Sequence, residues 1–160
     1  MRYQTTDYNC GPAALQNALK ALRHHVTQDK LAELAGTTPD GTDDEGLKRA
    51  VVALGFGVDE ISCVEPRVAF ARLYGSLLVG RPVVLCVDRW SHWVTAIGVC
   101  GTRVLLAEPG RYPYSLRENG LQVLNKDRLC KRWRAAHRVT GAGGPRYYGL
   151  AVGPCDTNAA

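Results

Sequence analysis

The first third of the chain carries apolar residues with the spacing of an amphipathic helix. They recur at i, i+3, i+4 and i+7, at Leu15, Ala18, Leu19 and Leu22. This pattern predicts a helix over residues 11–24. Pro12 fits the first turn of that helix, where the N–H that proline lacks would have no partner in the helix.

Two further helices are predicted before residue 56. The stretch VTQDKLAELAG predicts a helix that begins after Thr27 as N-cap and stops at Gly36. TPDGTDDEGLKRAVVALGFG predicts a turn and then a helix, capped near Thr42 or Asp43 and ended by Gly55.

From residue 57 onward, runs rich in β-branched residues predict strands, with one helix among them. The predicted strands are 58–64, 82–88, 92–100, 103–108 and 147–152, and the helix is 67–80. Gly101 and Thr102 are a two-residue hairpin signal between two of these strands. Helices first and an antiparallel sheet later predict an α+β fold. We expect one domain over residues 1–155 and a frayed tail over 156–160.

Composition excludes several classes of protein. Length and apolar content are typical of a globular chain with a proper core, and the longest apolar runs are far too short to span a bilayer. We therefore expect no membrane partner, and since the N-terminus lacks a secretory h-region, we expect a cytoplasmic location.

The net charge is +5, with an acidic first part and a basic second part. The densest basic stretch, residues 126–138, indicates either a surface for nucleic acid or an acidic partner, or the solvated face of a short helix, which we favour.

Six cysteines allow three disulfides on arithmetic alone, but a reducing compartment would not maintain them. No two form a CxxC pair, so we expect no structural metal and no cofactor. Cys63, Cys86 and Cys100 lie in apolar strand-like segments and are expected to be small buried hydrophobes. Cys10 differs because its neighbours, in QTTDYNCGPAAL, are polar and rich in turn formers.

A thiol at a helix N-terminus has its pKa lowered by the helix dipole and by free N–H groups, which favours the nucleophilic thiolate. Such a nucleophile needs a base, and His92 is the best candidate because it opens a predicted central strand between Trp90 and Trp93. A histidine at a strand end is more often structural. His24 and His25 end the first predicted helix, away from Cys10.

The imidazole would also need an orienting group. A hairpin folded about residues 101 and 102 brings His92 close to Glu108 or its neighbours, and Glu108 is the only carboxylate on that strand end. Asp88, four residues before His92 in the preceding loop, is a weaker candidate. The residues thus predict a Cys–His–acid arrangement.

Gln4, six residues before Cys10-Gly11-Pro12, together with His92-Trp93-Val94 and Glu108-Pro109, resembles the C39 and C39-like family of papain-fold cysteine peptidases. The resemblance covers nearly the whole chain. It implies a papain-like fold, in which an N-terminal helical subdomain packs on a C-terminal antiparallel β-sheet. Without a transporter segment, the chain resembles the stand-alone branch of the family.

The resemblance also implies roles for individual residues. Cys10 would be the nucleophile, His92 its general base and acid, Glu108 the group that orients His92, and Gln4 an oxyanion-hole donor beside the Cys10 N–H. Gly11 would let substrate approach closely. The family usually has Asp where this chain has Glu108, which is one methylene longer; a glutamate serves in triads on other folds.

The function expected from this resemblance is hydrolysis of a peptide bond in a peptide or protein substrate, with cleavage after Gly-Gly as in the double-glycine peptidases. The same residues would serve acyl transfer or side-chain amide hydrolysis, and a third alternative is a binding module that keeps the groove. Trp90 and Trp93 line that groove or pack in the core; the sequence leaves both roles open.

Overall fold

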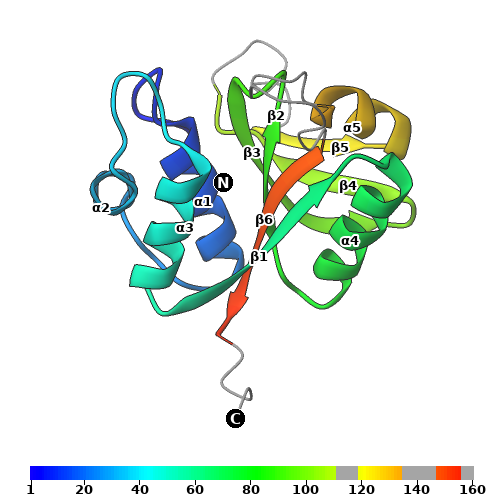
Figure 1. The fold of residues 1–160 in the computed structure, drawn as a ribbon, viewed down its shortest axis with the longest axis horizontal. Helices are drawn as coiled ribbons and strands as arrows, with labels where there is room; N and C mark the ends of the chain where they lie inside the picture. Colours follow the sequence, from blue (N-terminus) through cyan, green and yellow to red (C-terminus); the bar gives the residue numbers. More distant parts are fainter. Residues whose placement is uncertain (111–118, 135–146, 156–160) are drawn as a thin grey trace.

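A central sheet separates two groups of helices in the computed structural model, which describes residues 1–110, 119–134 and 147–155. Helices α1, α2 and α3 lie on one side of the sheet and α4 and α5 on the other (Figure 1). The helices are α1 (Cys10–Ala21), α2 (Gln28–Ala35), α3 (Asp44–Ala53), α4 (Pro66–Leu78) and α5 (Lys126–Trp133). The strands are β1 (Phe56–Cys63), β2 (Val83–Val87), β3 (His92–Cys100), β4 (Arg103–Ala107), β5 (Leu121–Leu124) and β6 (Tyr147–Pro154).

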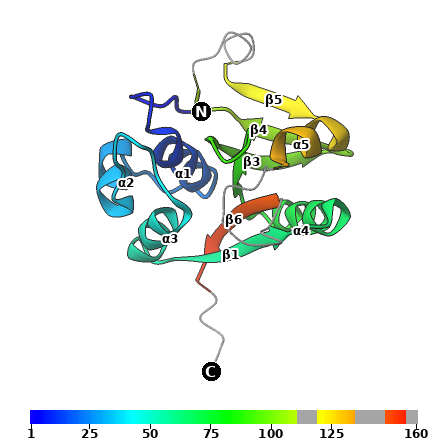
Figure 2. The ribbon, with the colours of Figure 1, turned by 45° about the horizontal axis from the view of Figure 1, so that its top comes forward.

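All neighbouring strands of the six-stranded sheet pair antiparallel, in the order β1-β6-β2-β3-β4-β5. This confirms the predicted α+β fold with a helical first part. The sequence did not predict β5, which lies at one edge of the sheet (Figure 2). Its four residues are too few to give a clear alternation of apolar and polar positions.

The predicted helix ends are largely confirmed. Thr27 caps α2 by accepting the N–H of Lys30, and Gly36 ends that helix in the left-handed conformation, with φ of 65°. Asp43, rather than Thr42, caps α3 through the N–H of Gly46. The first helix begins at Cys10, one residue earlier than predicted, and ends at Ala21.

Two apolar layers, one on each face of the sheet, hold the fold together. Alternate residues of the central strands enter opposite layers, so Cys86 and Trp93 pack under α1–α3 while Val87 and Val94 pack under α4 and α5. Within the described residues no helix is long and apolar enough to cross a bilayer.

Only part of the basic stretch, residues 126–134, lies within the described residues, and it forms α5 and its C-cap. Leu129 and Trp133 are buried against the sheet, whereas Arg128 and Lys131 are exposed. This arrangement agrees with a solvated helix face, except that Arg132 lies on the inner side of the helix.

A β-bulge in the hairpin of β3 and β4 decides which face the end of β4 presents. Cys100 pairs with Arg103 across the predicted two-residue turn, but the register shifts between Ala96 and Gly98, so that Thr95 pairs with Ala107. Without the shift, the residue after Ala107 would point to the face opposite His92, because a slip of one residue exchanges the two faces.

The contact between α2 and α3 gives a prediction for stability. A Cβ at Gly46 would lie 2.2 Å from the carbonyl oxygen of Ala35, whereas a Cβ at Gly75, inside α4, would meet nothing within 4 Å. We expect Gly46→Ala to lower the free energy of unfolding by about 2 kcal/mol or more, because backbone must move. Gly75→Ala should raise it by about 0.5–1 kcal/mol. Urea denaturation of both variants measures this; equal effects would contradict the packing described.

Candidate active site

Cys10 is the first residue of α1 and is buried, with 9% of its surface exposed. Burial by itself raises the pKa of the thiol. A hydrogen bond with His92, backbone N–H groups of Trp93 and Gly11, and the charge of His92 outweigh burial and lower the pKa below its ordinary value. The structure therefore places Cys10 where a thiolate is stabilised.

His92 is the first residue of β3 and joins Cys10 to Glu108. Its Nε2 atom lies 2.5 Å from Oε1 of Glu108, which leaves Nδ1 for the hydrogen bond with Cys10. Burial lowers the pKa of the imidazole, but the hydrogen bonds with Cys10 and Glu108 outweigh it and raise the pKa to about 9. The opposite shifts of Cys10 and His92 are those of a thiolate–imidazolium pair.

Glu108 follows β4 and has no exposed surface, which is unusual for a carboxylate. Its Oε1 accepts from His92 and from the N–H of Gly110 at 3.0 Å, and its Oε2 accepts from Nη2 of Arg132 at 2.6 Å. Burial raises the pKa of this carboxyl, but His92 and then Arg132 outweigh it and lower the pKa to about 2. Glu108 is therefore ionised and fully hydrogen-bonded.

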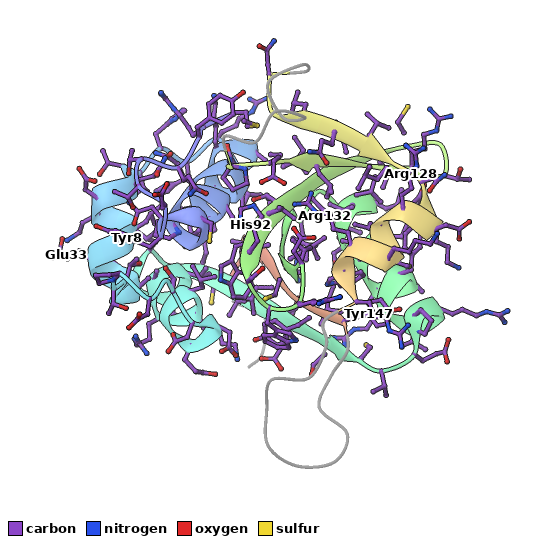
Figure 3. The ribbon with its side chains drawn as sticks, turned by 90° about the horizontal axis from the view of Figure 1, so that it is seen from above. Tyr8, Glu33, His92, Arg128, Arg132 and Tyr147 are labelled. Atoms are coloured by element: carbon purple, nitrogen blue, oxygen red, sulfur yellow. The ribbon has the colours of Figure 1, made fainter. Side chains whose placement is uncertain are left out.

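Arg132 was not among the predicted site residues. It projects from the inner side of α5 and lies next to His92 at the centre of Figure 3, whereas Arg128 of the same helix lies at the outer side. One feature of the sequence could have identified Arg132 as an inward-facing residue. Leu129 and Trp133 are spaced i, i+4 and form an apolar face, and Arg132, three residues after Leu129, lies on the same side of the helix.

Gln4 lies in the segment before α1 and is tied to the Glu108 side of the site. Its backbone N–H donates to the carbonyl of Pro109 at 2.9 Å, and its side-chain Nε2 donates to the carbonyl of Thr6 at 2.9 Å. An amide NH₂ has two donors, so one remains after the bond with Thr6.

Gly11, expected to let substrate approach, and Trp93, expected either to line the groove or to pack in the core, are buried against the loop before α3. A Cβ at Gly11 would lie 2.8 Å from Cβ of Thr42, and the Trp93 indole N–H donates to the Thr42 carbonyl at 2.9 Å. Because Gly11 has no side chain, α1 packs closely against Thr42 in this structure. Trp90 is partly exposed and packs on Tyr148, with ring centroids 5.2 Å apart.

The other cysteines lie in environments that differ from that of Cys10. Cys86 is buried, and burial with the nearby negative groups Cys10, Asp44 and Asp88 raises its thiol pKa to about 12. Cys63 is half-buried, and Cys100 is exposed because it is the last residue of β3, so the expectation that it is buried was wrong. Over the described ranges no group of His, Cys, Asp and Glu side chains could hold a metal ion.

Comparison with known proteins gives one family. The family model described as "Peptidase C39 family" matches residues 1–127. An uncharacterized protein of Methanothermobacter marburgensis is 32% identical over 111 residues, which are 66% of this chain and 68% of that protein.

Solved structures give the same fold. The peptidase domain of Streptococcus ComA, described as a bi-functional ABC transporter, superposes with a TM-score of 0.69 at 18% identity, covering 96% of this chain and 97% of that domain. A double-glycine-motif protease from an AMS/PCAT transporter, in complex with its leader peptide, superposes with a TM-score of 0.67 at 15% identity, covering 96% and 89%. At these identities the likeness establishes the fold, which confirms the papain-like architecture expected from the sequence.

The buried carboxylate gives a prediction for the pH dependence of stability. Because the pKa of Glu108 is about 2 when folded and ordinarily 4.5, its contribution is present above pH 4.5 and is lost as the pH falls toward 2. We expect this group to account for a loss of about 3 kcal/mol of unfolding free energy over that window. Urea denaturation between pH 6 and pH 2.5 should show a steeper acid loss for the wild type than for Glu108→Gln. Parallel curves would contradict an ionised Glu108.

Proposed function

Because this chain belongs to the C39 peptidase family, we propose that it is a cysteine peptidase in which the thiolate of Cys10 attacks the peptide bond. The observation that carries the proposal is the continuous path from Cys10 through His92 to a fully buried Glu108. A nucleophile, a base and a group that orients the base are the elements of thiol-based acyl transfer.

The proposed reaction has two stages. The Cys10 sulfur bonds to the carbonyl carbon, His92 gives its proton to the leaving amine as the C–N bond breaks, and an acyl-enzyme forms. Water then attacks the carbonyl carbon of the thioester while His92 takes a proton from that water. The C–S bond breaks, the carboxylic acid leaves, and the Cys10 thiolate and the protonated His92 are restored. Glu108 stays ionised and holds the ring through Nε2.

Gln4 is proposed to stabilise the oxyanion that develops on the carbonyl oxygen. The donors would be the second N–H of its side-chain amide and the backbone N–H of Cys10, which lies in the first turn of α1 and has no acceptor in the helix. The bond from the Gln4 backbone to Pro109 supports this role, because it ties the amide's segment to the loop that carries Glu108.

The proposed substrate is a peptide cleaved after Gly-Gly. This extends to the present chain the specificity of the solved neighbour, a double-glycine-motif protease in complex with a leader peptide. Trp90, partly exposed and packed at a tilt against the ring of Tyr148, is the proposed contact with the substrate. Its aromatic face offers apolar area at low entropic cost.

Thiol alkylation tests the proposal without knowledge of the substrate. The exposed Cys100 and Cys155 serve as internal reference thiols. At pH 6.5 we expect iodoacetamide to label Cys10 about tenfold or more faster than these two, because the site lowers the pKa of the Cys10 thiol and so favours its thiolate. His92→Ala should bring Cys10 to the reference rate, as read by peptide mass spectrometry. Equal rates in the wild type would indicate a binding module.

Gln4→Ala separates the oxyanion role from activation of the thiol. On a peptide with Gly-Gly before the scissile bond, we expect kcat to fall about 10²–10³-fold, because one preorganised donor is lost. The rate of Cys10 alkylation should not change, because alkylation forms no oxyanion. A matched peptide with Leu-Leu in place of Gly-Gly is the substrate control. An unchanged kcat would remove Gln4 from the mechanism.

A further inference from the structure

We propose that Arg132 is a positioning residue for this reaction: it clamps the carboxylate of Glu108 and the turn that leads into His92, so that the imidazole is held toward Cys10. The inference rests on the proposed function and adds a fourth side chain to the path from Cys10 to Glu108. That side chain comes from α5, on the opposite side of the sheet from the helix that carries Cys10.

The guanidinium of Arg132 binds two carboxylates at once. Nη2 lies 2.6 Å from Oε2 of Glu108 and 2.9 Å from Oδ2 of Asp88, and Nε lies 3.2 Å and 3.1 Å from the two Asp88 oxygens. Nη1 lies 3.4 Å from Oε1 of Gln122. The bonds to the two carboxylates are charge-assisted. The Glu108 side chain has no exposed surface and 16% of the Arg132 side chain is exposed, whereas 41% of the Asp88 side chain is exposed, so the Glu108 bond is the one shielded from water.

The two carboxylates come from either side of the strand that carries His92. Asp88 directly follows β2 and Glu108 directly follows β4, and β3 lies between these strands in the sheet. Arg132 therefore bridges the ends of the two neighbouring strands beside the first residue of β3. A lysine has no planar fork with which to bind both groups in this way.

The turn before His92 needs such a clamp because its backbone is strained. Asp88, Arg89 and Trp90 have φ of 53°, 62° and 66°, a left-handed conformation that costs non-glycine residues about 1 kcal/mol or more each. Besides the ion pair, the N–H of Asp88 donates to the backbone carbonyl of Arg132 at 3.0 Å. The end of α5 thus holds the turn by main chain and side chain together.

The clamp also fixes the conformation of the Glu108 side chain. Glu108 directs Oε1 to His92 and Oε2 to Arg132, so its extra methylene has no free rotation. Among the described residues, the charged groups that face Glu108 are His92 and Arg132, with Asp88 beyond the guanidinium.

The test compares Arg132→Gln with Arg128→Gln, a matched loss of charge on the exposed side of α5. We expect Arg132→Gln to lower kcat/KM and the Cys10 alkylation rate at pH 6.5 about tenfold or more, because the imidazole loses its fixed orientation. The acid limb of the alkylation profile should move to higher pH, because without Arg132 the pKa of Glu108 rises. Arg128→Gln should leave both unchanged.

A double-mutant cycle distinguishes positioning from a general effect on structure. Because Arg132 and Glu108 hold the imidazole together, the loss of alkylation rate in the Arg132→Gln, Glu108→Gln double variant should be about tenfold or more smaller than the product of the two single losses, with the remaining loss due to the turn that Arg132 holds through Asp88. Arg132→Lys, which keeps a charge beside Glu108, tests the geometry if the glutamine variant does not fold; it should stay folded and still lose most of the rate.

Two results overturn the inference while leaving the proposed function intact. One is a folded Arg132→Gln or Arg132→Lys protein that alkylates at the wild-type rate, and the other is a double variant whose losses multiply. If wild-type Cys10 itself reacts no faster than Cys100 and Cys155, the proposed function fails first.

Discussion

A buried carboxylate is the constraint on which the site depends. Glu108 has no exposed surface, and an unpaired charge there would cost far more than a domain of this size could tolerate. His92 and Arg132 supply the two cationic partners and Gly110 a backbone N–H. Those partners come from β3, α5 and the loop after β4. Ionisation of Glu108 therefore requires that all three parts of the chain are correctly placed around it.

The same requirement explains why the imidazole is oriented. One ring nitrogen of His92 is hydrogen-bonded to Glu108 and the other to Cys10, so the two bonds together fix the orientation of the ring. Cys10 in turn lies at the start of α1, where N–H groups favour its anion. The path of hydrogen bonds thus runs from the helical layer at Cys10, past the end of the sheet, to α5 in the opposite layer, and both layers contribute side chains to one site.

Much of this arrangement is visible in local sequence. Helix ends at Thr27 and Gly36, a cap at Thr42 or Asp43, and the two-residue hairpin after Cys100 follow from propensity and turn chemistry. Such features depend on a few neighbouring residues, so they can be inferred without knowing how distant parts of the chain meet. Cys10, His92 and Glu108 were inferred from their places at the ends of predicted elements, whereas Gln4 came from the resemblance to the C39 family.

Tertiary structure decided the remainder. The bulge between Ala96 and Gly98 sets the face of the sheet on which Glu108 lies, and it was not predicted from the sequence. Gly11 and Trp93 both pack against Thr42, a contact between distant parts of the chain. Arg132 is largely buried against the ends of two strands, unlike the exposed basic residues of the same helix. By itself the sequence determined which groups could perform the chemistry and the approximate elements that carry them. Which of those groups touch, and which charge is buried, depends on non-local packing and strand register, because only the folded chain brings residues this far apart in sequence into contact.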